Sequence, residues 1–211
     1  LTTAHSLDWF TTHATAYPWN RRGYVMNIDL SVKILGDKEF MNKVKELNDK
    51  QLDKALRRTV TKTNTSVRKS IRTEVRTHYT LTAKRIIKDM PKTIFRRNGT
   101  EANIRTGEKP ITLRAYGGRM TRKGYSASPL KGQRQIINRS FTIKPNKVTL
   151  PFMRVGRKNY PIRGALKGPS LHAIVTTGSR SSKIQKQVLN TGDTRFLQVM
   201  KGEVDAVLRG F

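Results

Sequence analysis

The chain has 211 residues, no cysteine, and 43 Lys and Arg against 14 Asp and Glu, a formal net charge of +29. Its length and its hydrophobic fraction of 36% suffice for a folded core, and the lack of cysteine excludes disulfides, zinc–thiolate sites and thiol chemistry. So strong a positive charge favours an anionic partner: nucleic acid first, an anionic protein second, a lipid surface third. No apolar run approaches the roughly 20 residues that a membrane span needs.

The first 25 residues differ from the rest. Residues 1–25 are polar and aromatic, and Arg21 and Arg22 follow the aromatic residues, whereas a secretory signal places its charges before an apolar core. We expect Met26 to be the natural start, or at least residues 1–25 to be a peripheral leader. Residues 26–211 are then expected to form a single domain.

The pattern after Met26 begins with a strand and a helix. Apolar and polar residues alternate over 28–35, which predicts a strand. Asp37 is a suitable helix cap, and apolar residues at helical spacing predict a helix over 38–47.

Residues 52–76 give the strongest local signal. At about 100° per residue, one stripe of a helix carries Leu52, Leu56, Val60, Thr63, Val67 and Ile71. The other side carries Lys54, Arg57, Arg58, Lys62, Arg68, Lys69, Arg72 and Arg76, which makes a basic amphipathic helix. The threonine-rich middle has weak helix propensity. Either the helix breaks there or tertiary packing holds one long helix, which we favour.

A second, short helix is predicted over 82–90. Thr80 or Thr82 is a suitable cap, and Pro91 would stop the helix. The apolar residues expected to face inward are Ala83, Ile86 and Ile87.

The middle of the chain has weaker periodicity. Residues 92–97 read as a strand, and 98–138 are rich in glycine and basic residues. Within this segment, 115–132 is predicted to be either a long loop or an extended β-arm, since long loops in compact domains are usually functional or disordered.

The last third recovers a clear pattern. Residues 139–155 predict a hairpin with its turn at 144–147, and 182–208 predict a C-terminal amphipathic helix, continuous or interrupted at Gly192 and Asp193. The fold class is therefore α+β, an antiparallel sheet flanked by a long basic N-terminal helix and the C-terminal helix.

The residue types needed for most catalytic sites are missing. Between Glu108 and Asp193 there is no acidic residue among 18 Lys and Arg, so this half cannot supply the clustered carboxylates of hydrolases or two-metal nucleases. The histidines lack metal-ligand spacing: His5, His13, His78 and His172. No nucleophile elbow and no glycine-rich phosphate loop is present. We expect no catalytic residue, no metal and no cofactor.

The basic residues remain as candidate contacts with DNA or an anionic partner, because Lys and Arg at a phosphate backbone give salt-dependent, sequence-independent affinity. Many could equally be solvated surface. The candidates are Arg57, Arg58, Lys62, Arg68, Lys69, Arg72, Arg76, Arg119, Arg122, Lys123, Arg154, Arg157, Lys158 and Arg163; the same loops also carry Lys131 and Arg134. No base-reading motif is visible.

A Gly168–Pro169–Ser170 stretch precedes an apolar run. It could start a short helix with Pro169 early in the first turn, where free N–H groups attract an anion. A plain turn explains it as well.

Three stretches resemble the minor tail protein Z family of tailed phages and prophages, also described as tail completion proteins. They are ALRRTVTKTNTSVRKSIRTEVRTHYTLTAKRIIKDM (55–90), YPIRGALKGPSLHAIV (160–175) and FLQVMKGEVDAVLRGF (196–211). The second is similar to the family's Pro-Ile, Leu and Gly-Pro-Ser arrangement, here Pro161, Ile162, Leu166, Gly168, Pro169 and Ser170.

The resemblance implies a non-enzymatic virion protein in which the Gly-Pro-Ser turn is a structural corner packing sheet against helix. Such a protein acts at the head-proximal tail end, in head–tail joining and genome-end positioning. Its implied partners are other tail and neck proteins, further copies of itself and, non-specifically, double-stranded DNA, with no membrane. Its implied location is the virion tail, and the host cytoplasm during assembly. The alternative is a free, sequence-nonspecific nucleic-acid-binding protein.

Overall fold

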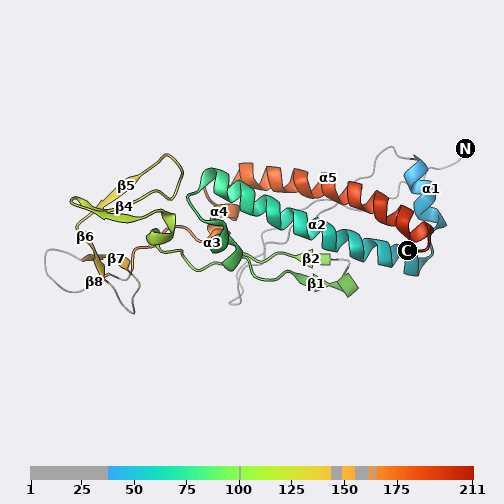
Figure 1. The fold of residues 1–211 in the computed structure, drawn as a ribbon, viewed down its shortest axis with the longest axis horizontal. Helices are drawn as coiled ribbons and strands as arrows, with labels where there is room; N and C mark the ends of the chain where they lie inside the picture. Colours follow the sequence, from blue (N-terminus) through green and yellow to red (C-terminus); the bar gives the residue numbers. More distant parts are fainter. Residues whose placement is uncertain (1–37, 100, 144–148, 155–161, 164) are drawn as a thin grey trace, which may run out of the picture. The chain divides into compact units, whose positions relative to one another are not determined.

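A computed structural model describes residues 38–99, 101–143, 149–154, 162–163 and 165–211 (Figure 1). The predicted leader, Met26, the strand over 28–35 and the Asp37 cap lie outside these residues. Helices and small antiparallel sheets make up the described chain, with a long helix toward each end of it, so the predicted α+β class is confirmed.

The chain divides into two compact units. Of the described residues, the helical unit takes those of 38–70, Lys92–Arg105 and Lys186–Phe211, and the sheet unit takes those of Ile71–Pro91 and Thr106–Gln185. Two long helices, α2 (Asp49–His78) and α5 (Ser181–Leu208), contribute residues to both units.

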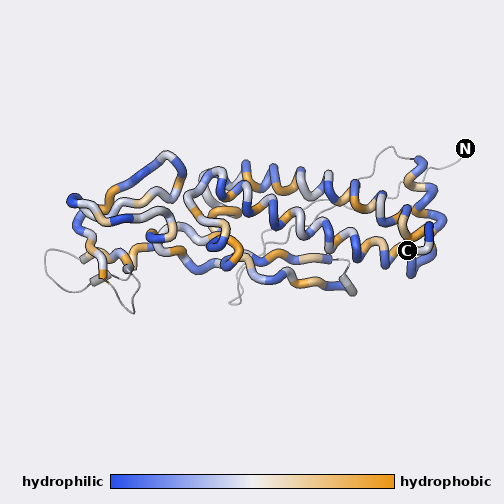
Figure 2. Tube along the Cα trace, in the orientation of Figure 1, coloured by the Kyte–Doolittle hydropathy of each residue, from blue (hydrophilic) through white to orange (hydrophobic). Residues whose placement is uncertain are grey.

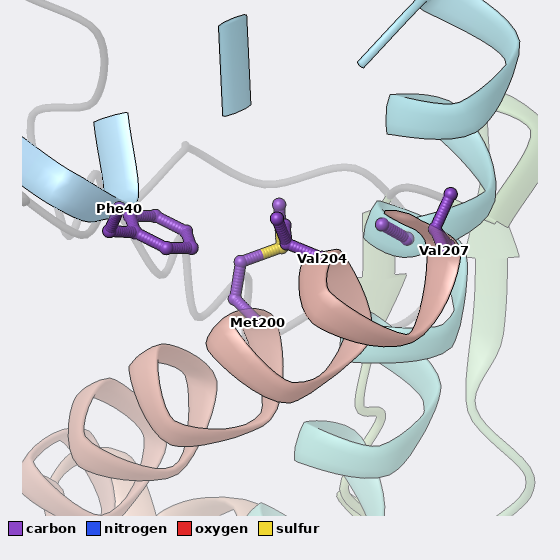
Figure 3. Packing of buried hydrophobic residues seen from close by; sticks show 5 residues of the cluster. Phe40, Met200, Val204 and Val207 are labelled. Atoms are coloured by element: carbon purple, nitrogen blue, oxygen red, sulfur yellow. The ribbon is translucent and has the colours of Figure 1, made fainter. Parts of the chain in front are cut away.

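In the helical unit α2 and α5 run antiparallel and side by side (Figure 1). The Thr59 hydroxyl lies 3.4 Å from the Met200 sulfur, and the Ser70 hydroxyl donates to Thr191 at 3.3 Å. The helix α1 (Lys38–Glu46) confirms the prediction for 38–47. Its Phe40 reaches toward Met200 and Val204, in a buried cluster with Ala55 and Val207 (Figure 3).

The long helix α2 is unbroken across its threonine-rich middle. Thr59 and Thr63 are buried, whereas the exposed Thr61 and Thr65 donate their hydroxyls to carbonyls four residues earlier. Packing of the buried side of α2, where Thr59 lies against Met200 of α5, offsets the weak helix propensity of threonine. The helix α5 likewise continues through Gly192 and Asp193, so the interrupted form is not observed.

A two-stranded ribbon completes the helical unit. The strands β1 (Ile94–Arg96) and β2 (Glu101–Asn103) pair antiparallel, which confirms the strand predicted over 92–97. Between them lies the short 3₁₀ helix η1 (Arg97–Gly99), where Arg97 takes a left-handed φ of 46°.

The sheet unit contains the short helix α3 (Ala83–Lys88); of the two predicted caps, Thr80 and Thr82, the Thr82 hydroxyl is the one observed. Ile86 is fully buried, but Ile87 is 47% exposed, so the expectation that both face inward is wrong. Consecutive helical residues point about 100° apart, and a six-residue helix that buries Ile86 turns Ile87 outward.

The glycine-rich segment folds into β-structure. The 3₁₀ helix η2 (Leu113–Tyr116) leads to a three-stranded antiparallel sheet of β3 (Arg119–Thr121), β4 (Gly124–Ala127) and β5 (Gln135–Asn138). Of the two alternatives for 115–132, the β-arm is therefore the one observed.

A second sheet joins β6 (Ser140–Ile143), β7 (Leu150–Arg154) and β8 (Ile162–Arg163). Ile143 pairs with Leu150, which confirms the hairpin predicted over 139–155. Phe141 and Phe152 stack across this pair at 6.3 Å between ring centroids. The predicted turn at 144–147 lies outside the described residues.

The Gly168–Pro169–Ser170 stretch forms a corner before α4 (Leu171–Thr176). Ser170 is the helix cap and accepts a hydrogen bond from the Ala173 N–H at 3.0 Å, so Pro169 precedes the helix instead of lying in its first turn. The Pro169 carbonyl accepts from the buried Tyr116 hydroxyl at 2.5 Å, and the Gly168 N–H donates to the Ile111 carbonyl at 2.7 Å. All three residues thus have packing roles.

Candidate nucleic-acid interface

The excess positive charge is distributed unequally between the two units. Among the described residues, the sheet unit has 18 Lys and Arg against three acidic residues, whereas the helical unit has 18 against eight. An anionic partner is therefore attracted most strongly to the sheet unit.

In the helical unit, three predicted contact residues of α2 have partners within the protein. Glu203 on α5 is buried, with 5% of its surface exposed, and its carboxylate lies 2.5 Å from Lys62 Nζ and 3.7 Å from Arg58 Nη1. Arg57 pairs with Asp53 one turn earlier. Because a buried carboxylate needs a cation, Lys62 and Arg58 serve the packing of α2 against α5.

Arg68 is half-buried. Its guanidinium donates to the Thr93 hydroxyl at 3.2 Å, and that hydroxyl donates to Asn64 at 3.0 Å. Burial lowers the pKa of Arg68 from its ordinary value, though an arginine stays charged. This side chain ties α2 to the segment that leads into β1.

The remaining predicted cations of α2 have no such partner. Lys69 and Arg76 are exposed and Arg72 is half-buried, and none of them pairs with a carboxylate in the described part of the chain. Their spacing of three and four residues places them on one side of α2. The predicted basic helix face is therefore divided between structural cations and available ones.

The β3–β4 hairpin presents Arg119, Arg122 and Lys123, all exposed. Thr121 pairs with Gly124, so that Arg122 and Lys123 alone form the turn, which is hydrophilic in Figure 2. The Thr121 hydroxyl donates to the Gly124 carbonyl at 2.7 Å. Gly124 has a φ of 138°, a conformation that side chains rarely adopt. The result is a narrow tip carrying two cations.

The residues on either side of β5 add further cations to this sheet. Arg134 donates to the Ser126 hydroxyl at 3.2 Å, across the β4–β5 pair. Lys131 and Arg139 are exposed. Sequence reasoning did not select Arg139, which sits at the bend between β5 and β6 with a left-handed φ of 57°. Left-handed positions usually carry Gly or Asn. This one carries arginine, so no local sequence signal marks the bend.

The other predicted residues are placed only in part. Arg157, Lys158 and Pro161 lie outside the described residues. Arg154 pairs with Ile162 and Met153 with Arg163, in the β7–β8 ladder. The Leu166 N–H donates to the Pro151 carbonyl at 2.7 Å.

The described residues hold no group of three or more histidine, aspartate or glutamate side chains placed to bind a metal ion. None of their helices combines the length and the apolar character that crossing a membrane requires.

Comparison with known families gives one match. The model of a family of unknown function, DUF6441, matches residues 26–142. The chain belongs to this family. The DUF6441 match takes in α1, α2, α3 and the β3–β5 sheet with its exposed cations, and ends within β6. No curated protein and no solved structure matches the chain.

Proposed function

We propose that this protein is a structural, non-enzymatic minor tail protein of a tailed phage or prophage. It completes the head-proximal end of the tail and helps to position the genome end during head–tail joining. Its partners are other tail and neck proteins and further copies of itself.

The observation that carries this proposal is the resemblance of three stretches to the minor tail protein Z family. Those stretches, 55–90, 160–175 and 196–211, contain most of α2 with α3, the corner before α4, and the C-terminal part of α5. The resemblance thus concerns segments that build the framework of the fold. A resemblance confined to surface loops would be weaker support.

The charge distribution supports the same proposal. The genome passes through the junction of head and tail, and a protein placed there gains from cations that are not neutralised internally. The sheet unit supplies such cations. A segment without a carboxylate between Glu108 and Asp193 also suits a structural role better than metal-assisted hydrolysis.

Deletion of the gene in a host that carries it tests the proposal. We expect the induced lysate to contain normal-looking heads and tails by electron microscopy, with infectivity lost and restored by a plasmid copy. A deletion lysate of unchanged titre would refute an essential role in tail completion.

A free nucleic-acid-binding protein is the second candidate, favoured by the uncompensated cations of the sheet unit. Sedimentation of an induced lysate through a density gradient discriminates the two. A tail protein co-sediments with intact particles, whereas a free binder stays at the top of the gradient or follows nuclease-sensitive material.

A further inference from the structure

We propose that the β3–β4–β5 sheet of the sheet unit, with the bend at Arg139, is a binding surface for the phosphate backbone of duplex DNA. The contact residues are Arg119, Arg122, Lys123, Arg134 and Arg139. Binding is independent of base sequence.

The strand register brings cations together on one face of this sheet. Arg119 on β3, Ser126 on β4 and Ile136 on β5 form one row across the three strands. Alternate residues of a strand share a face, so Arg134 lies on the side of Ile136, and its hydrogen bond to Ser126 agrees. Ser126 thus lies next to both arginines, and Ile136, at the β5 end of the row, is 47% exposed.

The tip of the hairpin extends this surface. Arg122 and Lys123 occupy a two-residue turn, and no cation of the contact set pairs with a carboxylate among the described residues. β4 pairs with β5 as far as Gly124, so this turn lies at the end of a three-stranded sheet. Its two exposed cations can contact phosphates next to those met by the face of the sheet.

The backbone at Arg139 supplies a second observation. A left-handed φ is costly for a residue with a side chain and is normally given to glycine. The bend is fixed by the next residue, because the buried Ser140 hydroxyl accepts from the Tyr125 N–H at 2.6 Å and donates to the Ile137 carbonyl. Glycine at position 139 would relieve the backbone, yet the position carries an exposed arginine. This choice is explained if its charge is used.

Duplex DNA fits this surface better than an acidic protein segment does. The centre of a protein–protein interface is depleted in charged residues and enriched in apolar ones. This sheet exposes two large apolar side chains, Met120 on β3 and Ile136 on β5, and strand alternation places them on opposite faces, so the face of Arg119 and Arg134 carries only one of them. DNA offers a phosphate charge about every 1.7 Å along its axis, which suits cations spread over several strands.

The inference does not rest on the tail role, because DNA binding is a property of the purified protein. We would measure binding of the full chain to a short fluorescein-labelled duplex of mixed sequence, by anisotropy over a salt series. The variants are R122Q/K123Q and R139G. The matched control is K45Q/K50Q, which removes the same charge as the double variant from exposed positions in the helical unit.

We expect the slope of log K against log salt to shrink by about two for R122Q/K123Q and by about one for R139G. When the salt rises from about 50 to 200 mM, the affinity of both proteins falls. The factor by which it falls is then roughly tenfold smaller for the double variant than for the wild type. R139G should also melt no lower than the wild type, which separates lost binding from lost folding. The control variant should keep the wild-type slope.

Two results would overturn the proposal. One is an equal reduction of the slope by K45Q/K50Q and R122Q/K123Q, which would mean that net charge alone governs binding. The other concerns competition with the labelled duplex. If polyglutamate displaces it at a lower concentration of negative charges than unlabelled duplex does, the surface belongs to an acidic protein partner. Either result leaves the deletion experiment, and so the tail role, unaffected.

Discussion

Replacing Gly168 with alanine tests the packing of the corner before α4. The added Cβ would lie 2.7 Å from Cε2 and 3.2 Å from Cδ2 of Tyr116. Tyr116 is fully buried, and its hydroxyl is held by the Pro169 carbonyl, so the ring cannot move aside without losing a hydrogen bond. Overpacking of this kind costs about 1–3 kcal/mol. In a chain of this size each kcal/mol lowers the melting temperature by about 2–4 °C, so we expect a loss of about 2–12 °C.

Gly202→Ala is the matched control for this substitution. Gly202 lies within α5 with no atom within 4 Å of an added Cβ, so alanine there should stabilise the protein by about 0.5–1 kcal/mol through helix propensity. Calorimetry of both variants gives the sign of each change, and hydrogen exchange at η2 and α4 locates the loss caused by Gly168→Ala. A Gly168→Ala protein that melts at or above the wild-type temperature would refute the steric reasoning.

Three further predictions concern stability. Lys62→Gln weakens the pairing of the buried Glu203 and should lower the free energy of unfolding, measured with urea, by about 1–2 kcal/mol. The control Lys54→Gln, at an exposed position, should lower it by less than about 0.5 kcal/mol. Equal losses would contradict a structural role for Lys62. Ser170→Ala removes the cap of α4 and should cost about 1 kcal/mol, seen as faster amide exchange in that helix. Burial raises the pKa of the Asp193 carboxyl, so the folded chain binds this proton more tightly and its stability falls as pH rises above the ordinary carboxyl pKa of 3.8. Asp193→Asn should therefore raise the melting temperature more near neutral pH than in acid, and a gain confined to acid would contradict this sign.

The elements that sequence reasoning located correctly are those with short-range patterns. The apolar stripe of α2 repeats every three to four residues, the Thr82 hydroxyl caps α3 three residues away, and the β6–β7 hairpin pairs residues close along the chain. Each of these signals lies within a window of about 18 residues, so a single pass along the chain detects it. The concentration of positive charge between Glu108 and Asp193 is equally visible without a structure.

The sequence by itself thus determined the α+β class, the long basic helix and the charge excess that directs attention to an anionic partner. Only the tertiary structure decided which cations are available. Lys62 and Arg58 looked like their neighbours until Glu203, more than a hundred residues later, was found buried beside them. Arg139 was indistinguishable from other arginines until the bend at Ser140 showed its left-handed backbone. Ion pairs and bends of this kind depend on residues that meet only when the chain folds, and no local pattern records which partner a charge will find.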